Sequence, residues 1–128
     1  MHLERVHVSE DAEKQLGFSQ AVKIGEALWV SGAVSWDESF NPLHVGDMAG
    51  QMRQIYGALD ALLKRFDRGM DAIIKETVFA TDLDLALQNT QVRRDFFPDE
   101  QFPASTWVEV SRLAHPDLLL EVEIVAQL

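Results

Sequence analysis

Hydrophobic and polar residues alternate along a first short stretch, residues 3–8, with the period of two that is typical of a β-strand. A second and a third stretch, residues 21–24 and 27–34, are rich in apolar residues, and we expect each of them to be a short strand. The second and third stretches are separated by a two-residue turn, so we expect them to form a hairpin. Gly32 interrupts the third stretch and predicts a bulge or a close approach to the backbone. The charged segment 9–14 shows no such period, and we expect a loop or a single turn there.

Two longer segments show the three- and four-residue spacing of apolar residues that indicates an amphipathic helix. The first begins after Asp47, a good N-cap residue, and we expect it to end at Gly69. The apolar positions of this helix are Met48, Met52, Ile55, Tyr56, Leu59, Leu62, Leu63 and Phe66. The second segment begins after Asp82 or Asp84 and runs to about residue 97, ahead of a proline that stops it.

Three further strands are expected around the second helix. Residues 74–81 alternate before it, residues 106–113 alternate after it, and residues 118–125 are dense in Leu, Val and Ile. A His-Pro-Asp loop separates the last two runs, which predicts a closing hairpin. Glu121 and Glu123 interrupt the last run, and polar groups in a buried strand cost free energy unless they are satisfied. They are therefore candidates for a site or an interface.

The expected order β-β-β-α-β-α-β-β predicts an α+β fold in which two helices cover one face of a mixed sheet. A chain of 128 residues has room for one domain, and we expect residues 1–128 to form it. The other sheet face needs cover too, because strands that carry Trp29, Trp107 and Val108 would otherwise expose an apolar patch. A homo-oligomer that buries this face is the simplest arrangement.

Composition narrows the range of partners and chemistry. The hydrophobic fraction of 47% supports a packed core, and 21 acidic against 11 basic residues give a formal net charge of -10. Such acidity argues against nucleic acid and against an anionic membrane as partners, since both attract positive surfaces. Cysteine is absent, and the four histidines lack the spacing of a metal motif, so we expect no metal site. No apolar run reaches membrane-spanning length and no signal-like segment is present, so we expect a cytoplasmic protein.

An ordered set of short motifs covers nearly the whole chain. It comprises Phe18-Ser19-Gln20-Ala21-Val22, Trp29-Val30-Ser31-Gly32, Gly46-Asp47 with Gln51, Lys75-Glu76-Thr77-Val78, Thr81-Asp82-Leu83, Phe96-Phe97, the run from Phe102-Pro103-Ala104 to Leu113, and Glu121-Val122-Glu123-Ile124-Val125-Ala126. With these motifs the chain resembles the RidA/YjgF/YER057c/UK114 family of imine and enamine deaminases. The resemblance implies a chorismate-mutase-like fold, a homotrimer with a small-molecule cleft at each subunit interface, and no metal or organic cofactor.

The resemblance also implies a catalytic site, from which this chain departs at one central position. In the family, a strand-borne Arg after Pro-Ala binds the carboxylate of the substrate, and a Glu on the last strand orients the attacking water. The Glu is kept as Glu121, whereas Ser105 stands where the Arg would be. A planar guanidinium fits a carboxylate with two hydrogen bonds. Losing one such charge-assisted contact costs about 1.5–3 kcal/mol of binding free energy.

Other substrate-binding positions implied by the resemblance are partly changed. Ser31 and Gly32 match the family, while Phe18 replaces a common Tyr, Thr90 a usual Asn and Trp107 a small residue. Each has a structural alternative: Phe18 can be ordinary core, Ser31 and Gly32 a bulge, and Trp107 interface core. Likewise, Ser105 can be a solvated residue at a strand start, and Glu121 a structural acid.

These departures remove a fixed positive charge and a phenol hydroxyl and add an indole. Arg93 and Arg94 on the second helix would be the replacements for the charge, but we expect them on a solvated helix face. The sequence therefore predicts a hydrolytic deaminase of an imine or enamine other than the standard small 2-iminoacid. The alternative is a non-catalytic binding or regulatory trimer of the same fold, and a third reading is an interaction protein that uses the trimer surface.

Overall fold

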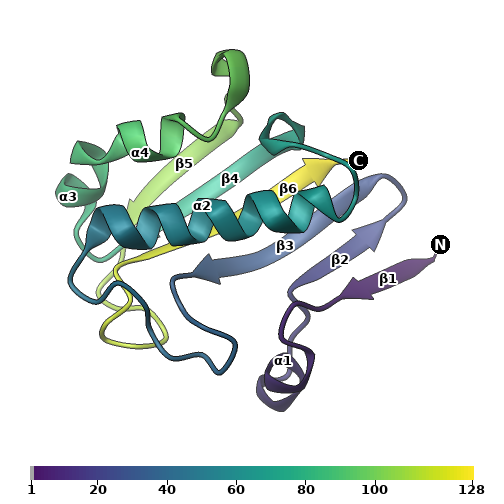
Figure 1. Ribbon diagram of the computed structural model, residues 1–128, viewed down its shortest axis with the longest axis horizontal. Helices are drawn as coiled ribbons and strands as arrows, with labels where there is room; N and C mark the ends of the chain where they lie inside the picture. Colours follow the sequence, from purple (N-terminus) through teal and green to yellow (C-terminus); the bar gives the residue numbers. More distant parts are fainter. Residues whose placement is uncertain (1) are drawn as a thin grey trace.

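A mixed β-sheet with helices on one face makes up the part of the chain that the computed structural model describes, residues 2–128 (Figure 1). Its strands are β1 (Leu3–Val6), β2 (Ala21–Ile24), β3 (Ala27–Val34), β4 (Ile73–Ala80), β5 (Ala104–Glu109) and β6 (Leu120–Gln127). Its helices are α1 (Glu10–Leu16), α2 (Met48–Lys64), α3 (Leu83–Gln88) and α4 (Thr90–Arg94), with 3-10 turns at Met70–Ala72 and Pro98–Glu100. The α+β class expected from the sequence is confirmed.

The strand order is β1-β2-β3-β6-β4-β5, so the predicted closing hairpin is wrong. β6 lies between β3 and β4 and is antiparallel to both, while β5 pairs in parallel with β4 at the sheet edge (Figure 1). The reason lies in burial. Leu120, Val122 and Ile124 of β6 are at most 3% exposed, which suits a central strand, whereas five of the six residues of β5 are exposed. The chain between β5 and β6 reverses direction, as it would in a hairpin, but it passes the end of β4, so β6 pairs with β4 on the side away from β5.

Several local predictions agree with the structure and others do not. The hairpin of β2 and β3 is confirmed, and so are the bulge near Gly32 and the N-cap at Asp47, whose side chain accepts from the Gly50 N–H at 2.9 Å. α1 occupies the segment expected to be a loop or a single turn. α2 ends at Lys64, ahead of the predicted end at Gly69, and the second predicted helix breaks at Asn89 into α3 and α4.

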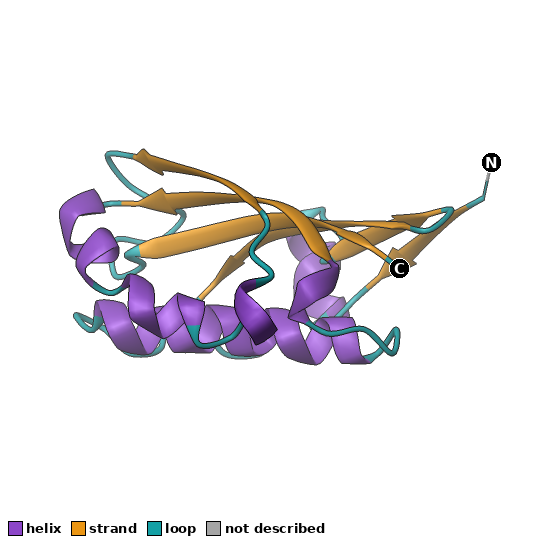
Figure 2. Ribbon diagram, turned by 90° about the horizontal axis from the view of Figure 1, so that it is seen from above, coloured by secondary structure: helices purple, strands orange, loops and turns teal. Residues whose placement is uncertain are grey.

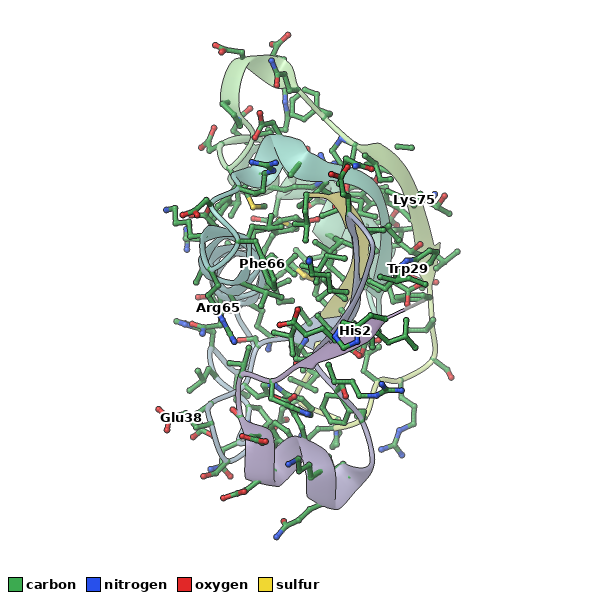
Figure 3. All side chains as sticks on the ribbon, turned by 90° about the vertical axis from the view of Figure 1, so that its right-hand side faces the viewer. His2, Trp29, Glu38, Arg65, Phe66 and Lys75 are labelled. Atoms are coloured by element: carbon green, nitrogen blue, oxygen red, sulfur yellow. The ribbon has the colours of Figure 1, made fainter. Side chains whose placement is uncertain are left out.

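The hydrophobic core lies between the sheet and α2. The apolar face of α2 is almost completely buried, as predicted from its spacing; its members include Met52, Ile55, Tyr56, Leu59 and Leu63. Figure 2 shows the helical layer on one side of the sheet and the other side open. Trp29 is 56% exposed on this open face, and Figure 3 shows it with Lys75 on the side opposite Phe66. None of the helices in residues 2–128 combines the length and the apolar character needed to cross a membrane.

Candidate functional site

The predicted site residues fall into two groups on opposite faces of the sheet. Glu121 alternates along β6 with Leu120 and Val122, which are buried beneath the helices, so its side chain lies on the open face. Ser105 pairs in register with Glu76, which is fully buried on the helix side. A single chain therefore does not bring Glu121 and Ser105 together.

The first group is built around the bulge in β3. The register between β3 and β6 shifts between Val30 and Ala33, and Gly32 lies within this shift. A Cβ atom on Gly32 would lie 2.6 Å from Cδ of Glu121, far inside van der Waals contact. The glycine thus lets the carboxyl group of Glu121 lie directly against the backbone of the neighbouring strand.

Ser31 belongs to the same group, and its polar atoms are partly used by the chain itself. Its N–H donates to the carbonyl oxygen of Gln20 at 2.8 Å, and its Oγ donates to the carbonyl oxygen of Ser19 at 2.7 Å. The hydroxyl proton is therefore committed, and a lone pair of Oγ remains to accept a hydrogen bond from a ligand.

A buried acid, which sequence reasoning missed, holds the segment from Phe18 to Gln20 in place. Glu13 of α1 is 1% exposed and accepts from the backbone N–H groups of Val8, Ser9 and Gln20 at 2.5–2.9 Å. Its Oε1 also lies 2.7 Å from Nδ1 of His7. Burial alone would raise the pKa of Glu13, but these donors together lower it below the ordinary value.

Phe18 takes part in an aromatic row at the end of this segment. Its ring stacks on Phe40 with the centroids 6.1 Å apart, and Phe40 stacks on Trp36 at 4.0 Å. Trp36 and Phe40 also border a hollow of about 470 Å³, which contains none of the predicted site residues. A second hollow of about 410 Å³ lies on the open sheet face and includes Ser31, Trp29 and Glu123.

Electrostatics set Glu121 apart from an ordinary surface carboxylate. Burial raises its pKa, and the negative charge of Glu123 raises it further. The two side chains are two residues apart on β6 and share the open face. A half-buried carboxylate with a raised pKa can exchange a proton with a bound reactant nearer to neutral pH than a solvated one.

The second group centres on a buried carboxylate that we name, with its partners, the Glu76 cluster: Glu76, Tyr56, Arg93, Ser105 and Trp107. The Tyr56 hydroxyl donates to Oε1 of Glu76 at 2.6 Å. Oε2 accepts from Nη2 of Arg93 and from Oγ of Ser105, the latter at 2.7 Å. Nε1 of Trp107 donates to Oγ of Ser105 at 2.8 Å. The acid beside Tyr56 also raises the pKa of that phenol, after burial as the main cause.

The expectation that Arg93 lies on a solvated helix face is wrong. Arg93 is only 7% exposed, and its guanidinium lies over the rings of Phe97 and Trp107 at 4.9 and 5.9 Å from the centroids. Arg94 is exposed as expected, with 48% of its side chain accessible. The physical reason is Glu76, because a buried carboxylate requires a cation and donors nearby. The sequence offered one signal for this pairing, namely that Glu76 lies among the buried positions of β4.

Thr90, the remaining predicted ligand residue, lies at the start of α4, one helical turn before Arg93. Residues three apart on a helix share a face, so Thr90 belongs to the same side of α4 as the Glu76 cluster. Within residues 2–128, no group of three or more His, Asp or Glu side chains is arranged to hold a metal ion.

Comparison with known proteins assigns the chain to a family. The family model described as Endoribonuclease L-PSP matches residues 10–128. A RutC family protein of Pyrococcus horikoshii is 32% identical over 125 residues, which are 97% of this chain and 98% of the relative. The 3-aminoacrylate deaminase RutC of Acinetobacter baylyi is 31% identical over 106 residues, covering 83% of this chain and 82% of that protein.

Solved structures agree on the fold. The Rid family protein YyfA of Yersinia pestis superposes with a TM-score of 0.86 at 28% identity, covering 99% of this chain and all of that one. Rv2704 of Mycobacterium tuberculosis, described as a member of the YjgF/YER057c/UK114 family, has a TM-score of 0.82 at 24% identity and covers 99% of this chain. On these matches the chain belongs to the RidA/YjgF/YER057c/UK114 family, whose sequence model carries the description Endoribonuclease L-PSP.

Proposed function

We propose that this chain is a hydrolytic deaminase of an imine or enamine small molecule other than the standard small 2-iminoacid, with Glu121 as its general base. The observation that carries the proposal is the half-buried Glu121, which has a raised pKa and lies against the bulge at Gly32. The name of the Acinetobacter baylyi relative, 3-aminoacrylate deaminase, supports the reaction class.

The reaction needs a single residue that both takes and returns a proton. The oxygen of a water molecule attacks the carbon of the C=N bond while Glu121 accepts a proton from that water. Glu121 returns this proton to nitrogen, which gives a carbinolamine. It then takes the proton of the new hydroxyl group and delivers it to nitrogen as the C–N bond breaks, so that ammonia leaves and the hydroxyl oxygen becomes the carbonyl oxygen. An enamine is first protonated on carbon to give the imine. A carboxyl group with a raised pKa suits both halves of this exchange.

The cleft is completed by a second copy of the chain in a homotrimer. Support comes from the division of the site, since Glu121 and Ser105 lie on opposite faces of the sheet in one chain. β5 is the edge strand, so a neighbouring copy can bring its Ser105 and Trp107 next to the open face. That face also carries Trp29, which is 56% exposed and favours cover by another subunit.

Within this cleft the substrate-binding residues take different roles. Oγ of Ser31 accepts a hydrogen bond from the nitrogen of the substrate, because its own proton is committed to Ser19. Phe18 and Trp107 form the walls, and Gly32 gives the substrate access to the carboxyl group of Glu121. Thr90 of the neighbouring copy lines the opposite side.

A second candidate function, a non-catalytic binding trimer, is favoured by one observation. The hydroxyl of Ser105 donates to Glu76 and accepts from Trp107, so the position of the family's substrate-binding Arg supplies no donor to a substrate carboxylate. A protein of this kind binds its ligand without turning it over.

Imine-hydrolysis kinetics separate the two functions. An amino-acid oxidase would generate 2-iminoacids in situ from small, branched and aromatic amino acids, and an amine oxidase would generate imines without a carboxylate. Ammonia release and competition with semicarbazide are followed with the wild type and with Ser105→Arg. We expect the wild type to accelerate hydrolysis of at least one imine. Binding without acceleration across the whole panel would establish the non-catalytic function instead.

A further inference from the structure

The Glu76 cluster restores a cation to the region where Ser105 replaces the family's Arg. Arg93 reaches this region from α4 rather than from the strand, and its Nη2 donates to the same Glu76 oxygen that accepts from Ser105. The guanidinium is enclosed by Phe97, Phe102 and Trp107, with centroids 4.9–5.9 Å from Cζ. A positive charge is therefore present in this region, but it is already paired with the carboxylate of Glu76.

The anion of the cluster is the carboxylate of Glu76, a side chain of the protein itself that has no contact with solvent. Glu76 is fully buried, and its two oxygens accept from Tyr56, Ser105 and Arg93. Only Nη2 of Arg93 bonds Glu76, while Nε is buried without a partner among the described residues and the three surrounding rings lie over the guanidinium. A ligand carboxylate that reached the free side of the guanidinium would place a second buried anion beside Glu76, which is unfavourable because like charges in a buried site repel.

The surface that the cluster presents to a ligand is electrically neutral and poor in donors. Ser105 and Trp107 lie between the buried pair and solvent, and the polar hydrogens of both are committed, to Glu76 and to Ser105 respectively. The other half of the proposed cleft carries Glu121 and Glu123, and the chain has a formal net charge of -10. Lys75 is the cation of the hollow that holds Glu123, and its ammonium group donates to Oγ1 of Thr106 at 2.6 Å. An anionic substrate therefore meets repulsion from the two acids on one side, and the Glu76 cluster offers it no compensating cation on the other.

We infer that Glu76 and Arg93 determine specificity by selecting imines or enamines that carry no carboxylate, the class formed from amines rather than from amino acids. This inference rests on the proposed function, because it assigns the Glu76 cluster to the cleft in which Glu121 acts. The substrate is neutral, or cationic as its iminium form, and has an apolar or aromatic body that packs against Phe18 and Trp107.

Two imines that differ only in a carboxylate test the inference on the wild-type protein. An amine oxidase produces the imine of 2-phenylethylamine, and an L-amino-acid oxidase produces the 2-iminoacid of phenylalanine. We expect kcat/KM for ammonia release to be at least about tenfold higher for the imine without the carboxylate, because a carboxylate that enters the cleft loses its hydration without gaining a charge-assisted partner. A preference for the 2-iminoacid overturns the inference.

Substitution of the internal carboxylate gives the second arm. Glu76→Gln keeps the size of the side chain and one acceptor oxygen, for either Tyr56 or Ser105, but leaves the charge of Arg93 uncompensated. We expect this variant to shift the kcat/KM ratio toward the 2-iminoacid by about tenfold or more, and Glu76→Gln with Arg93→Gln to abolish the shift. Arg94→Gln, on the same helix but exposed, is the matched control and leaves the ratio unchanged.

Circular dichroism and size-exclusion chromatography establish whether Glu76→Gln is folded. A folded variant with an unchanged ratio of kcat/KM for the two imines would overturn the inference. If the variant does not fold, the kcat/KM ratio of the wild type for the two imines decides by itself whether the inference holds.

If the wild type hydrolyses neither these two imines nor any other imine of the panel, the proposed function fails, and binding decides the inference separately. Calorimetric or NMR titration with 2-phenylethylamine and L-phenylalanine compares two stable ligands that differ by a carboxylate. Tighter binding of the amine by the wild type, with the difference reduced in Glu76→Gln, supports a neutral, carboxylate-excluding pocket. Equal binding of both ligands, tighter binding of phenylalanine, or binding of neither contradicts it.

Discussion

At the scale of single residues, Glu121 combines the catalytic role that we propose with a cost to the stability of the fold. Its folded pKa is raised above the ordinary value of 4.5, so ionised Glu121 is less favourable in the folded chain than in the unfolded one. The folded state then binds more protons, and stability falls as pH rises through 4.5 toward the raised pKa. The side chain of Glu121→Gln has no ionisable group, so this variant does not lose stability in that way as the pH rises.

We therefore predict that Glu121→Gln raises the melting temperature at neutral pH while it abolishes imine hydrolysis. The gain in melting temperature should shrink as the pH is lowered through 4.5, because the wild-type carboxyl group is then protonated in both states. Thermal unfolding followed over a pH series measures this. A variant less stable than the wild type at neutral pH would mean that ionised Glu121 is stabilised by the fold.

The contact between Gly32 and Glu121 gives a prediction with a matched control. In Gly32→Ala the new methyl group would overlap Cδ of Glu121, so the carboxyl group must move, and we expect activity to fall at least about tenfold, as for other small displacements at active sites. Gly57→Ala, in the interior of α2 with open space around it, should raise stability by about 0.5–1 kcal/mol and leave activity unchanged. Steady-state rates and denaturant unfolding of both variants distinguish them; equal activity in both would contradict the assigned geometry.

Some residues of the site could be predicted from the sequence, and others could not. Glu121 and Gly32 stand out because each breaks a local pattern, an acid in an apolar run and a glycine within a strand. In the Glu76 cluster only Glu76 itself has such a signature, as an acid among the buried positions of β4. Arg93 and Ser105 lie 17 and 29 residues from Glu76, and only the packing of α4 and β5 against β4 brings them together.

At the scale of secondary-structure elements, α2 depends on its cap. Oδ1 of Asp47 accepts from the Gly50 N–H at 2.9 Å, which satisfies one of the free donors at the helix start. We predict that Asp47→Ala lowers the free energy of unfolding by about 1 kcal/mol, whereas Asp47→Asn keeps the cap and most of the stability. Denaturant titration of both variants measures the difference. Equal losses would show that the charge, rather than the hydrogen bond, matters.

The prediction of the elements was more reliable than that of their pairing. A period of two identifies β5 as a strand and a dense apolar run identifies β6, but neither pattern carries information about which strand lies beside which. The loop between them suggested a hairpin, while the structure places β6 centrally and β5 at the edge beside β4. The buried side chain of Gln51 fixes the loop between β5 and β6 to α2. Its amide donates to the carbonyl oxygen of Asp117 and accepts from the N–H of Leu119, both at 2.8 Å.

At the scale of the whole molecule, the open sheet face should decide assembly. We predict that the wild type elutes at three times the mass of one chain and that Trp29→Glu dissociates it, because the charge would be buried between subunits without a partner. Leu16→Glu, at an equally exposed apolar residue of α1, is the control and should remain a trimer. Light scattering coupled to size-exclusion chromatography gives the masses. A wild-type monomer would remove the basis for a shared cleft.

The most direct test of a catalytic cleft shared between subunits is complementation of two inactive variants. Glu121→Gln disables the half of the cleft that holds the base, and Trp107→Ala disables the half supplied by the neighbouring copy. Each variant alone should hydrolyse the best imine substrate poorly. Refolded together at equal amounts, random assembly leaves about one cleft in four with both halves intact, so hydrolysis should recover to about a quarter of the wild-type rate. No recovery in mixed trimers, with the wild type active, would contradict a site built from two copies of the chain.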